Sequence, residues 1–236
     1  AINREALVKA ILKGNGQVAH IPSSPSSWAY PDEDKIQKYD YNPKKSRKLL
    51  TAAGYTYNAG TKLFEKDGKP LKLTLKTSKG AASSIKMAQI IQQFLGQAGI
   101  SLEIQMLEWS SFLKVMHDKA HPRDFDLVIL GWSFDINDPD DTYTVWHSTG
   151  YPNGANMNGY QNPRVDALLE KGRRELDQEK RKAIYTDVFS QISKDAPYVF
   201  LFHSRSSIGA YKYVKGLAKP GPGGLLNPIE GVYIDR

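Results

Sequence analysis

The middle of the chain carries three stretches whose apolar residues follow the spacing of β-strands. Residues 71–77 and 100–107 alternate between apolar and polar positions, so each predicts a strand with one face toward the core and one toward water. Residues 125–132 are almost continuously apolar, which is typical of a strand covered on both faces. We therefore predict that the three strands belong to one sheet and that 125–132 lies in its interior.

Two stretches with helical spacing separate these strands. Residues 85–97 precede Gly99, a residue suited to end a helix, and residues 110–119 place apolar side chains on one face. Strand, helix, strand, helix, strand at this spacing predicts a parallel α/β sheet. Further elements are expected on both sides of it, namely helices at 4–13, 44–53, 141–147, 164–175 and 178–193, a hairpin turn at Asp67-Gly68, and a strand at 198–202.

The end of the chain has a different composition from the rest. Glycine and proline recur from residue 216 onward and oppose regular structure. We expect residues 216–236 to pack loosely.

Composition excludes several classes of protein. The 236 residues are 40% apolar and 24% charged, which is typical of a globular chain, and none is cysteine. A disulfide scaffold, a thiolate metal site and a cysteine nucleophile are therefore excluded. The sequence contains no apolar run of the roughly 20 residues that span a bilayer. It opens on a helical pattern without an initiator Met or a leader, so we expect a processed product or an excised fragment.

The net charge of +7 is compatible with nucleic acid as a partner. The lysines gather in residues 35–48, 62–79 and 171–182, where acids or amphipathic spacing accompany them. This distribution favours solvated basic faces, and we predict no nucleic-acid partner. A nucleic-acid module stays as an alternative, which salt-dependent retention on DNA would reveal.

Two patterns resemble metal sites but lack part of the required set. His117 and His121 have the spacing of a helical zinc pair, but Pro122 ends the helix there. The acidic stretch 135–141 lacks the glycine and the final glutamate of a calcium loop. We predict no metal and no cofactor.

The same acidic stretch raises the question of catalysis. Asp135 and Asp138 could serve as an acid and base pair, and Gly131-Trp132-Ser133 begins like a nucleophile elbow but lacks its closing glycine. We predict that the chain is not an enzyme, and a carboxylate-dependent hydrolase stays open as an alternative of another class.

A binding site is favoured at the carboxyl ends of the predicted strands. Asp135 follows the strand 125–132, Trp132 ends it, and Trp109 follows the strand 100–107. Ligands of open α/β sheets bind at this edge. Two indoles and a carboxylate there would form an apolar pocket that accepts an amine, and the alternative is two core tryptophans and a helix-capping aspartate.

Several segments together resemble the family 5 solute-binding proteins of ABC transporters, the oligopeptide-, dipeptide- and nickel-binding receptors. They are AINREALVKAILKGNGQVA, YDYNPKKSRKLLTAAGY, DGKPLKLTL, IIQQFLGQAGISLEIQMLEWSSFL, FDLVILGWSFDINDPDD and ISKDAPYVFLF. The most telling element is Trp132, Asp135, Asp138 and Pro139. The resemblance covers the C-terminal half of those receptors and implies a periplasmic-binding-protein type II-like lobe, an α/β fold with a mixed, mainly parallel sheet flanked by helices.

The resemblance also implies a function and a division of the chain. Residues 1–204 would form the C-terminal ligand-binding lobe, and 205–236 would return to a missing N-terminal lobe. Asp135 would pair with a peptide's amine while Trp109 and Trp132 line side-chain pockets. In some members arginines hold the peptide carboxylate, whereas Met116 and Ile129 stand near those positions here.

The implied protein is the extracytoplasmic receptor of an ABC importer, in the periplasm or as a cell-surface lipoprotein. It would bind oligopeptides or dipeptides and deliver them to a membrane permease. The alternative within the family is a receptor for nickel or another non-peptide solute.

Overall fold

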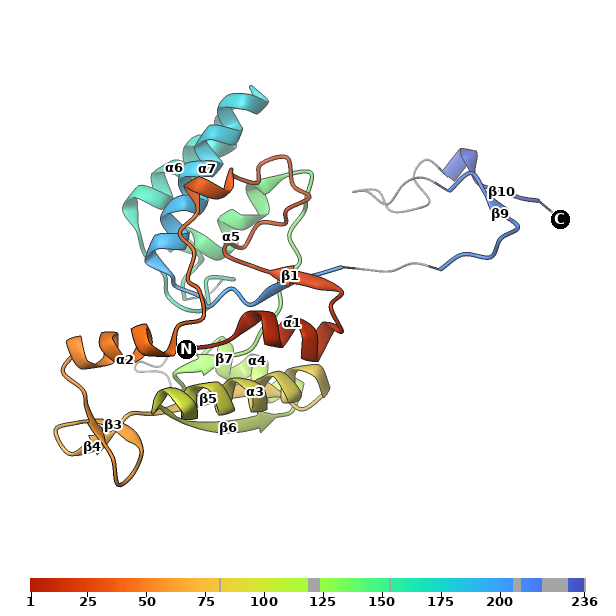
Figure 1. Cartoon of the computed structure of the whole chain (residues 1–236). Coiled ribbons are helices and arrows are strands. Elements are labelled where there is room, and N and C mark those ends of the chain that lie inside the picture. The colour runs from red at the N-terminus through yellow and green to blue at the C-terminus, as the bar shows by residue number, and fades with distance from the viewer. Residues whose placement is uncertain (81, 119–123, 153, 206–208, 218–228, 236) are drawn as a thin grey trace.

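The computed structural model describes residues 1–80, 82–118, 124–152, 154–205, 209–217 and 229–235 (Figure 1). Its central feature is a parallel three-stranded sheet made of β5 (Lys72–Ser78), β6 (Ser101–Leu107) and β7 (Leu127–Val128), in the order β6-β5-β7. Helix α3 (Ala82–Ala98) connects β5 to β6, and α4 (Trp109–Met116) lies between β6 and β7. The predicted parallel α/β arrangement is confirmed.

The prediction that 125–132 forms the interior strand is wrong. Within the described residues β7 pairs only with β5, so it lies at an edge, and β5 is the interior strand. Pairing ends where the Ile129 N–H donates to the carbonyl of Lys76. The chain then leaves the sheet, and Ile129 and Leu130 line a pocket. Ile129 and Leu130 are therefore apolar because they line the pocket, and not because they lie in the centre of the sheet.

The wet face predicted for β5 is also wrong at one position. Lys76 is only 5% exposed, and its neighbours Leu75 and Thr77 are buried as well. The ammonium of Lys76 lies 2.5 Å from the carboxylate of Asp124, which precedes β7. A lysine can occupy a covered strand position when its charge reaches a partner near the surface.

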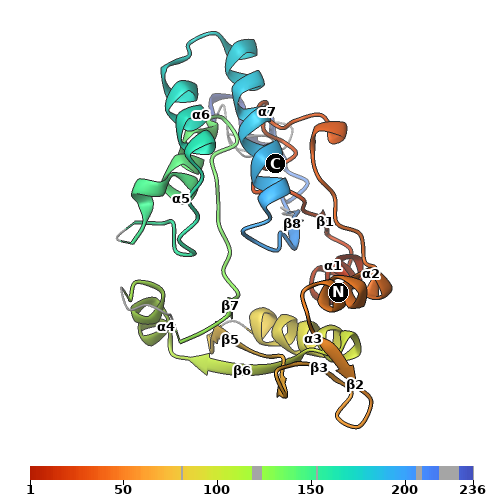
Figure 2. The ribbon, with the colours of Figure 1, turned by 90° about the vertical axis from the view of Figure 1, so that its left-hand side faces the viewer.

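Two hydrophobic cores share the chain, and Figure 2 shows the two bodies one above the other. The first core lies between the sheet and α3, with α1 (Arg4–Leu12) packed against it, and is made of Leu7, Leu75, Met87, Ala88, Ile91, Leu95, Ile100 and Leu102. Helical spacing places the α3 members of this core on one face of that helix.

The second core is built from helices. Helix α5 (Tyr143–Trp146) follows the 3₁₀ turn η2 (Pro139–Thr142), and α6 (Pro163–Arg174) and α7 (Gln178–Asp195) form a hairpin beside it. The fully buried indole of Trp146 lies among the helices, with the rings of Tyr198 and Phe200 at 4.7 and 6.0 Å from its own. These ring contacts explain why the strand predicted at 198–202 is observed only as β8 (Phe202–Ser204).

Arg4 joins the segments that run between the two cores. Its guanidinium donates hydrogen bonds to the carbonyls of Ala19, Phe200 and Tyr39 at 2.6, 3.0 and 2.5 Å. Nearby, β1 (Gly16–Val18) pairs antiparallel with β8. Burial lowers the pKa of Arg4. The three carbonyl oxygens that accept its hydrogen bonds nevertheless stabilise the charged guanidinium.

A small antiparallel unit projects from one end of the sheet (Figure 1). Helix α2 (Pro43–Ala52) is followed by β2 (Thr56–Asn58), β3 (Leu63–Lys66) and β4 (Lys69–Pro70). Asp67 and Gly68 both have positive φ, as the predicted hairpin turn requires.

The remaining elements are short, and part of the C-terminal region lies outside the described residues. The 3₁₀ turn η1 (Glu33–Lys35) precedes α2, η3 (Ser148–Gly150) follows α5, and η4 (Ile229–Gly231) precedes β10 (Tyr233–Ile234). Strand β10 pairs with β9 (Val214–Lys215), and Figure 1 shows this hairpin standing away from the two cores. The prediction for 216–236 can be compared with 216–217 and 229–235 only, and there large side chains such as Tyr233 and Ile234 are exposed.

Candidate functional site

A pocket of about 400 Å³ opens at the carboxyl ends of β5 and β7. Its walls combine aromatic, aliphatic and hydroxyl side chains and come from four segments of the chain. They are Thr77, Ser78, Gly80, Ser84, Trp109, Phe112, Ile129, Leu130 and Gly131. The pocket therefore lies at the sheet edge where ligands of α/β proteins bind.

Trp109, one of the three residues predicted at strand ends, forms one wall of this pocket. It is the first residue of α4, and its indole stacks on the buried ring of Phe112 with 5.8 Å between ring centroids. More than half of the side chain, 54%, is nevertheless exposed. A large apolar side chain held rigidly and left open to solvent is suited to contact a ligand.

Trp132 lies on the segment that continues from the pocket but does not line it. Its ring stacks on that of Phe134, with 6.2 Å between the ring centroids. With 36% of its surface exposed, it is a second ordered indole beside the opening. The structure thus places Trp109 in the pocket and Trp132 adjacent to it.

Asp135 lies four residues beyond the pocket residue Gly131, so roughly 13 Å of extended chain is the most that can separate their α-carbons. Its carboxylate is exposed, and one oxygen accepts the Asn137 N–H at 2.8 Å. Its own N–H donates to Asp141 Oδ2 at 2.5 Å. Among the described residues no cation lies within 4.0 Å of this carboxylate. In this chain the carboxylate of Asp135 is therefore open to solvent.

The loop that carries Asp135 is fastened to the helical body. Arg181 Nη2 lies 2.7 Å from Asp138 Oδ1, and Arg173 Nε lies 2.9 Å from Asp140 Oδ1. The Trp28 indole N–H donates to the Asn137 carbonyl at 2.7 Å. These contacts give a short acidic loop a defined position beside the pocket.

Asp141 shows that this loop concentrates negative charge. Burial raises the pKa of Asp141, and the nearby carboxylates of Asp135 and Asp138 raise it further. The same field favours a cationic ligand group near Asp135.

The geometry gives little support to hydrolysis by Asp135 and Asp138. Asp138 Oδ1 accepts hydrogen bonds from the Asp140 N–H and from Arg181, so the second carboxylate is engaged in holding the loop. No group of three metal-ligating side chains occurs in the part of the chain that the structure describes, and His121 of the histidine pair lies outside it.

Several pocket residues were not found from the sequence. Thr77 and Phe112 line the pocket although they belong to a predicted strand and a predicted helix, and Ser78 and Ser84 line it from positions next to predicted elements. One signal was present, because Gly80 lies two residues after the end of β5, where a strand end opens into a loop. A second hollow, of about 310 Å³, lies along α6 between charged side chains such as Glu170 and Arg174 and lacks any aromatic wall.

No helix among the described residues has the length and apolarity needed to cross a bilayer.

Comparison with known proteins identifies the family. The model for "Bacterial extracellular solute-binding proteins, family 5 Middle" matches residues 1–153. The chain belongs to this family. The family resemblance inferred from the sequence and the periplasmic-binding-protein fold are both confirmed.

Individual relatives agree with this assignment. The chain is 32% identical over 216 residues to the oligopeptide-binding protein AppA of Bacillus subtilis, which covers 92% of the chain and 39% of AppA. The structure of AppA with a nonapeptide matches with a TM-score of 0.80, covering 100% of the chain and 46% of AppA. DppA from Helicobacter pylori with the peptide STSA matches at 30% identity and a TM-score of 0.76, covering 100% of the chain and 42% of DppA.

A family member with a different ligand is also similar. NikZ from Campylobacter jejuni with Ni(L-His) matches at 26% identity and a TM-score of 0.77, covering 98% of the chain and 46% of NikZ. The chain thus spans less than half the length of each of these relatives.

Proposed function

We propose that this chain is one lobe of the extracytoplasmic receptor of an ABC importer and that the receptor binds oligopeptides or dipeptides for uptake. It acts by binding and delivery, without catalysis of its own. Its partners are a peptide, the membrane permease and the missing N-terminal lobe of the same receptor. The location is the periplasm or, for a lipoprotein, the outer face of the cell membrane.

The observation that carries this proposal is the carboxylate of Asp135, which has no cationic partner among the described residues and lies beside an aromatic pocket. A peptide has an ammonium group at one end and side chains of varied size next to it. The ammonium would pair with Asp135, and a side chain would enter the space beside Trp109. AppA and DppA, whose solved structures hold peptides, are the relatives that support this choice.

The lobe closes on its ligand only with the rest of the receptor. Asp135 and Trp109 are open to solvent here, so the second lobe must exclude water from them. We propose residues 1–204 as the ligand-binding lobe and 205–236 as the segment that returns to the other lobe. The exposed aromatic residues Tyr211, which precedes β9, and Tyr233, on β10, support such a contact, since exposed apolar side chains gain stability by packing.

A chelated metal is the second candidate ligand, because NikZ holds Ni(L-His) on a similar fold. A histidine chelate also presents an amine and a ring. The pocket therefore also suits such a chelate, and identifying the bound ligand distinguishes the chelate from a peptide.

The test uses the full-length receptor that contains this chain. Bound ligand is released from the purified receptor and identified by mass spectrometry, and peptides are then titrated by calorimetry in free-amine and N-acetylated forms. Recovery of peptides and weaker binding of the acetylated forms are expected. Recovery of a metal chelate would favour the second candidate, and cleavage of the added peptides would overturn the receptor assignment.

A further inference from the structure

The net positive charge of the chain is concentrated at the end of the sheet opposite the pocket. Residues 43–70 contain seven Lys and Arg and two acidic residues, a net charge of +5, while the other 208 residues contain 25 Lys and Arg and 23 acidic residues. We call residues 43–70, which form α2 and β2–β4, the basic end. Figure 2 shows α2, β2 and β3 at one side of the sheet and α4, which lines the pocket, at the other.

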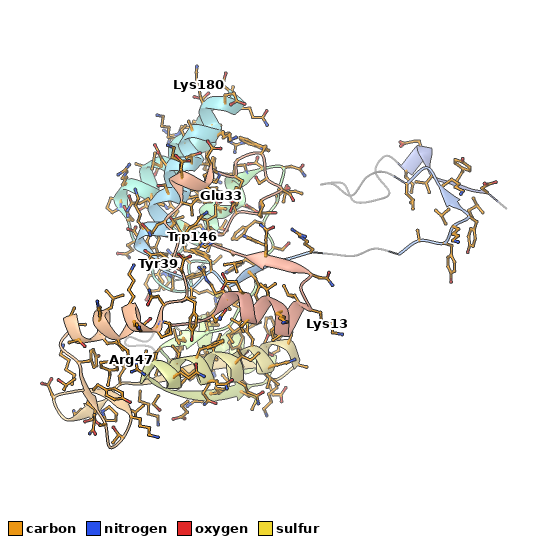
Figure 3. All side chains as sticks on the ribbon, in the orientation of Figure 1. Lys13, Glu33, Tyr39, Arg47, Trp146 and Lys180 are labelled. Atoms are coloured by element: carbon orange, nitrogen blue, oxygen red, sulfur yellow. The ribbon has the colours of Figure 1, made fainter. Side chains whose placement is uncertain are left out.

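Two of these cations have a structural task. Arg47, labelled in Figure 3, donates from Nη2 to the Gln97 carbonyl in the last turn of α3. Lys66 donates to the Ala53 carbonyl at the end of α2. Both satisfy carbonyls at helix C-termini, where positive charge is favourable.

Five other lysines of the basic end have no such task. They are Lys44, Lys45, Lys48, Lys62 and Lys69. All are exposed, and no carboxylate in the described ranges lies within 4.0 Å of any of them. Elsewhere the fold does provide such partners, as for Lys72 with Glu103 and Lys79 with Glu108.

The position of two of these lysines works against the stability of their own helix. Lys44 and Lys45 lie in the first turn of α2, which, like that of α3 and α4 and unlike that of α1, α6 and α7, has no acidic residue. Positive charge at a helix N-terminus opposes the helix dipole. A local arrangement that costs stability without a structural gain points to a function.

Exposed apolar side chains accompany the charges. Leu49 on α2 is 61% exposed, and Tyr57 on β2 is 41% exposed beneath the guanidinium of Arg47. Helical spacing places Lys44, Lys45 and Lys48 on one outward arc of α2 with Leu49 at its margin. Exposed lysines accompanied by an exposed leucine and tyrosine match the interface of an anionic bilayer, which takes cations at the headgroups and apolar side chains just below them.

We propose that the basic end binds the anionic phospholipid surface of the membrane from which the importer operates. The inference goes beyond ligand binding and rests on the proposed function only for the location outside the cytoplasm. Strand β5 runs from the basic end to the pocket, a distance of roughly 20 Å along its seven residues. A receptor held by the basic end therefore keeps the pocket clear of the lipid. Lysine ammonium groups are point charges, so the recognised chemistry is the phosphate charge and no particular headgroup.

The test measures sedimentation of the full-length receptor with vesicles of phosphatidylcholine alone and of phosphatidylcholine mixed with phosphatidylglycerol, at low and high salt. We expect binding only to the mixed vesicles, and only at low salt. The variant Lys44→Gln/Lys45→Gln/Lys48→Gln should bind roughly 100-fold more weakly. Its unfolding midpoint should stay the same or rise, because two charges that oppose the helix dipole are gone.

The control variant Lys171→Gln/Lys180→Gln/Lys194→Gln removes the same charge from exposed positions on α6 and α7. It should retain vesicle binding, and both variants should retain peptide affinity, which separates this inference from the proposed function. Equal losses in the two variants would overturn it, as would equal binding to neutral vesicles. Tighter binding to duplex DNA than to the mixed vesicles at the same salt would assign the basic end to nucleic acid instead.

Discussion

The guanidinium of Arg181 on α7 lies 2.7 Å from Asp138, three residues after the exposed carboxylate of Asp135. A helix of the second core thus fixes a loop that borders a pocket in the first. Burial lowers the pKa of Arg181, but the hydrogen bond and charge of Asp138 outweigh it, and the net shift is upward. The position of Asp135 therefore depends on a contact remote from any ligand.

Replacing Arg181 with glutamine should destabilise the chain. Asp138 would lose its partner while the Arg181 position stays largely covered, which costs about 1–2 kcal/mol of unfolding free energy. Lys72→Gln is the control, because both side chains of the Lys72–Glu103 pair are well exposed and its loss should change stability by less than about 0.5 kcal/mol. Denaturant unfolding measures both. Equal midpoints for the two variants would show that the Asp138 contact does not hold the loop.

The buried Lys76 allows a second prediction about stability. Asp124→Asn should destabilise the chain because it leaves a charge on the covered strand without its partner. Lys76→Met should be neutral or stabilising, since methionine fills similar space without a charge to desolvate. Adding Asp124→Asn to Lys76→Met should then change little. If Lys76→Met is as harmful as Asp124→Asn, the ion pair itself stabilises the sheet.

The sequence predicted the order and type of most elements because each is determined by local spacing. Asn3, Asn42 and Asn162 cap α1, α2 and α6 with their side chains, as short-range signals suggest. The position of strands within the sheet depends on contacts distant in sequence. The apolar run 125–132 predicted an interior strand, yet its end lines a pocket, and the lysine-bearing strand β5 lies between the other two.

The candidate site could be predicted only in part for the same reason. Of the three residues predicted from strand ends, Trp109 lines the pocket, while Trp132 and Asp135 lie on the segment that continues from it. The hydroxyl side chains Thr77 and Ser84 were missed because nothing local separates a pocket wall from a core face. The two cores were also missed, since alternation shows which face of an element is apolar but not which core it joins.

Two histidines predict how stability depends on pH. Burial lowers the pKa of His203 and of His20 below the usual value of 6.5. The unfolded chain therefore binds more protons at mildly acidic pH, and stability falls as pH drops below about 6.5 toward the folded pKa values, by at most about 1.4 kcal/mol per pH unit for each group. His203→Phe should make this fall shallower, as followed by denaturant unfolding between about pH 5 and 7.

The control for this measurement replaces a histidine on the surface. His117→Gln, at an exposed position after α4, should leave the slope unchanged. If His203→Phe leaves the slope of stability against pH the same as in the parent, groups other than His203 cause the loss of stability in acid.

Asp135 is expected to be the residue whose loss most weakens binding in the full-length receptor. Its carboxylate has no cation within 4.0 Å among the described residues, lies on a loop fixed by Arg181 and Arg173, and follows the stacked indole of Trp132 by three residues. When a peptide and the second lobe exclude water, an ammonium beside this carboxylate forms a charge-assisted bond in a low dielectric. Losing one partner of such a pair leaves the other charge desolvated.

Asp135→Asn preserves the shape of the side chain and removes its charge. It should weaken free-amine peptides by about 100-fold, equivalent to about 2.7 kcal/mol, and N-acetylated peptides by far less, because these bring no charge to pair. Asp177→Asn, an N-cap at the start of α7 in the other body, is the control and should leave affinity unchanged. Calorimetric titration with both peptide forms distinguishes loss of charge from loss of packing. If free-amine peptides bind Asp135→Asn as tightly as they bind the parent, Asp135 serves only as the loop cap that accepts the Asn137 N–H.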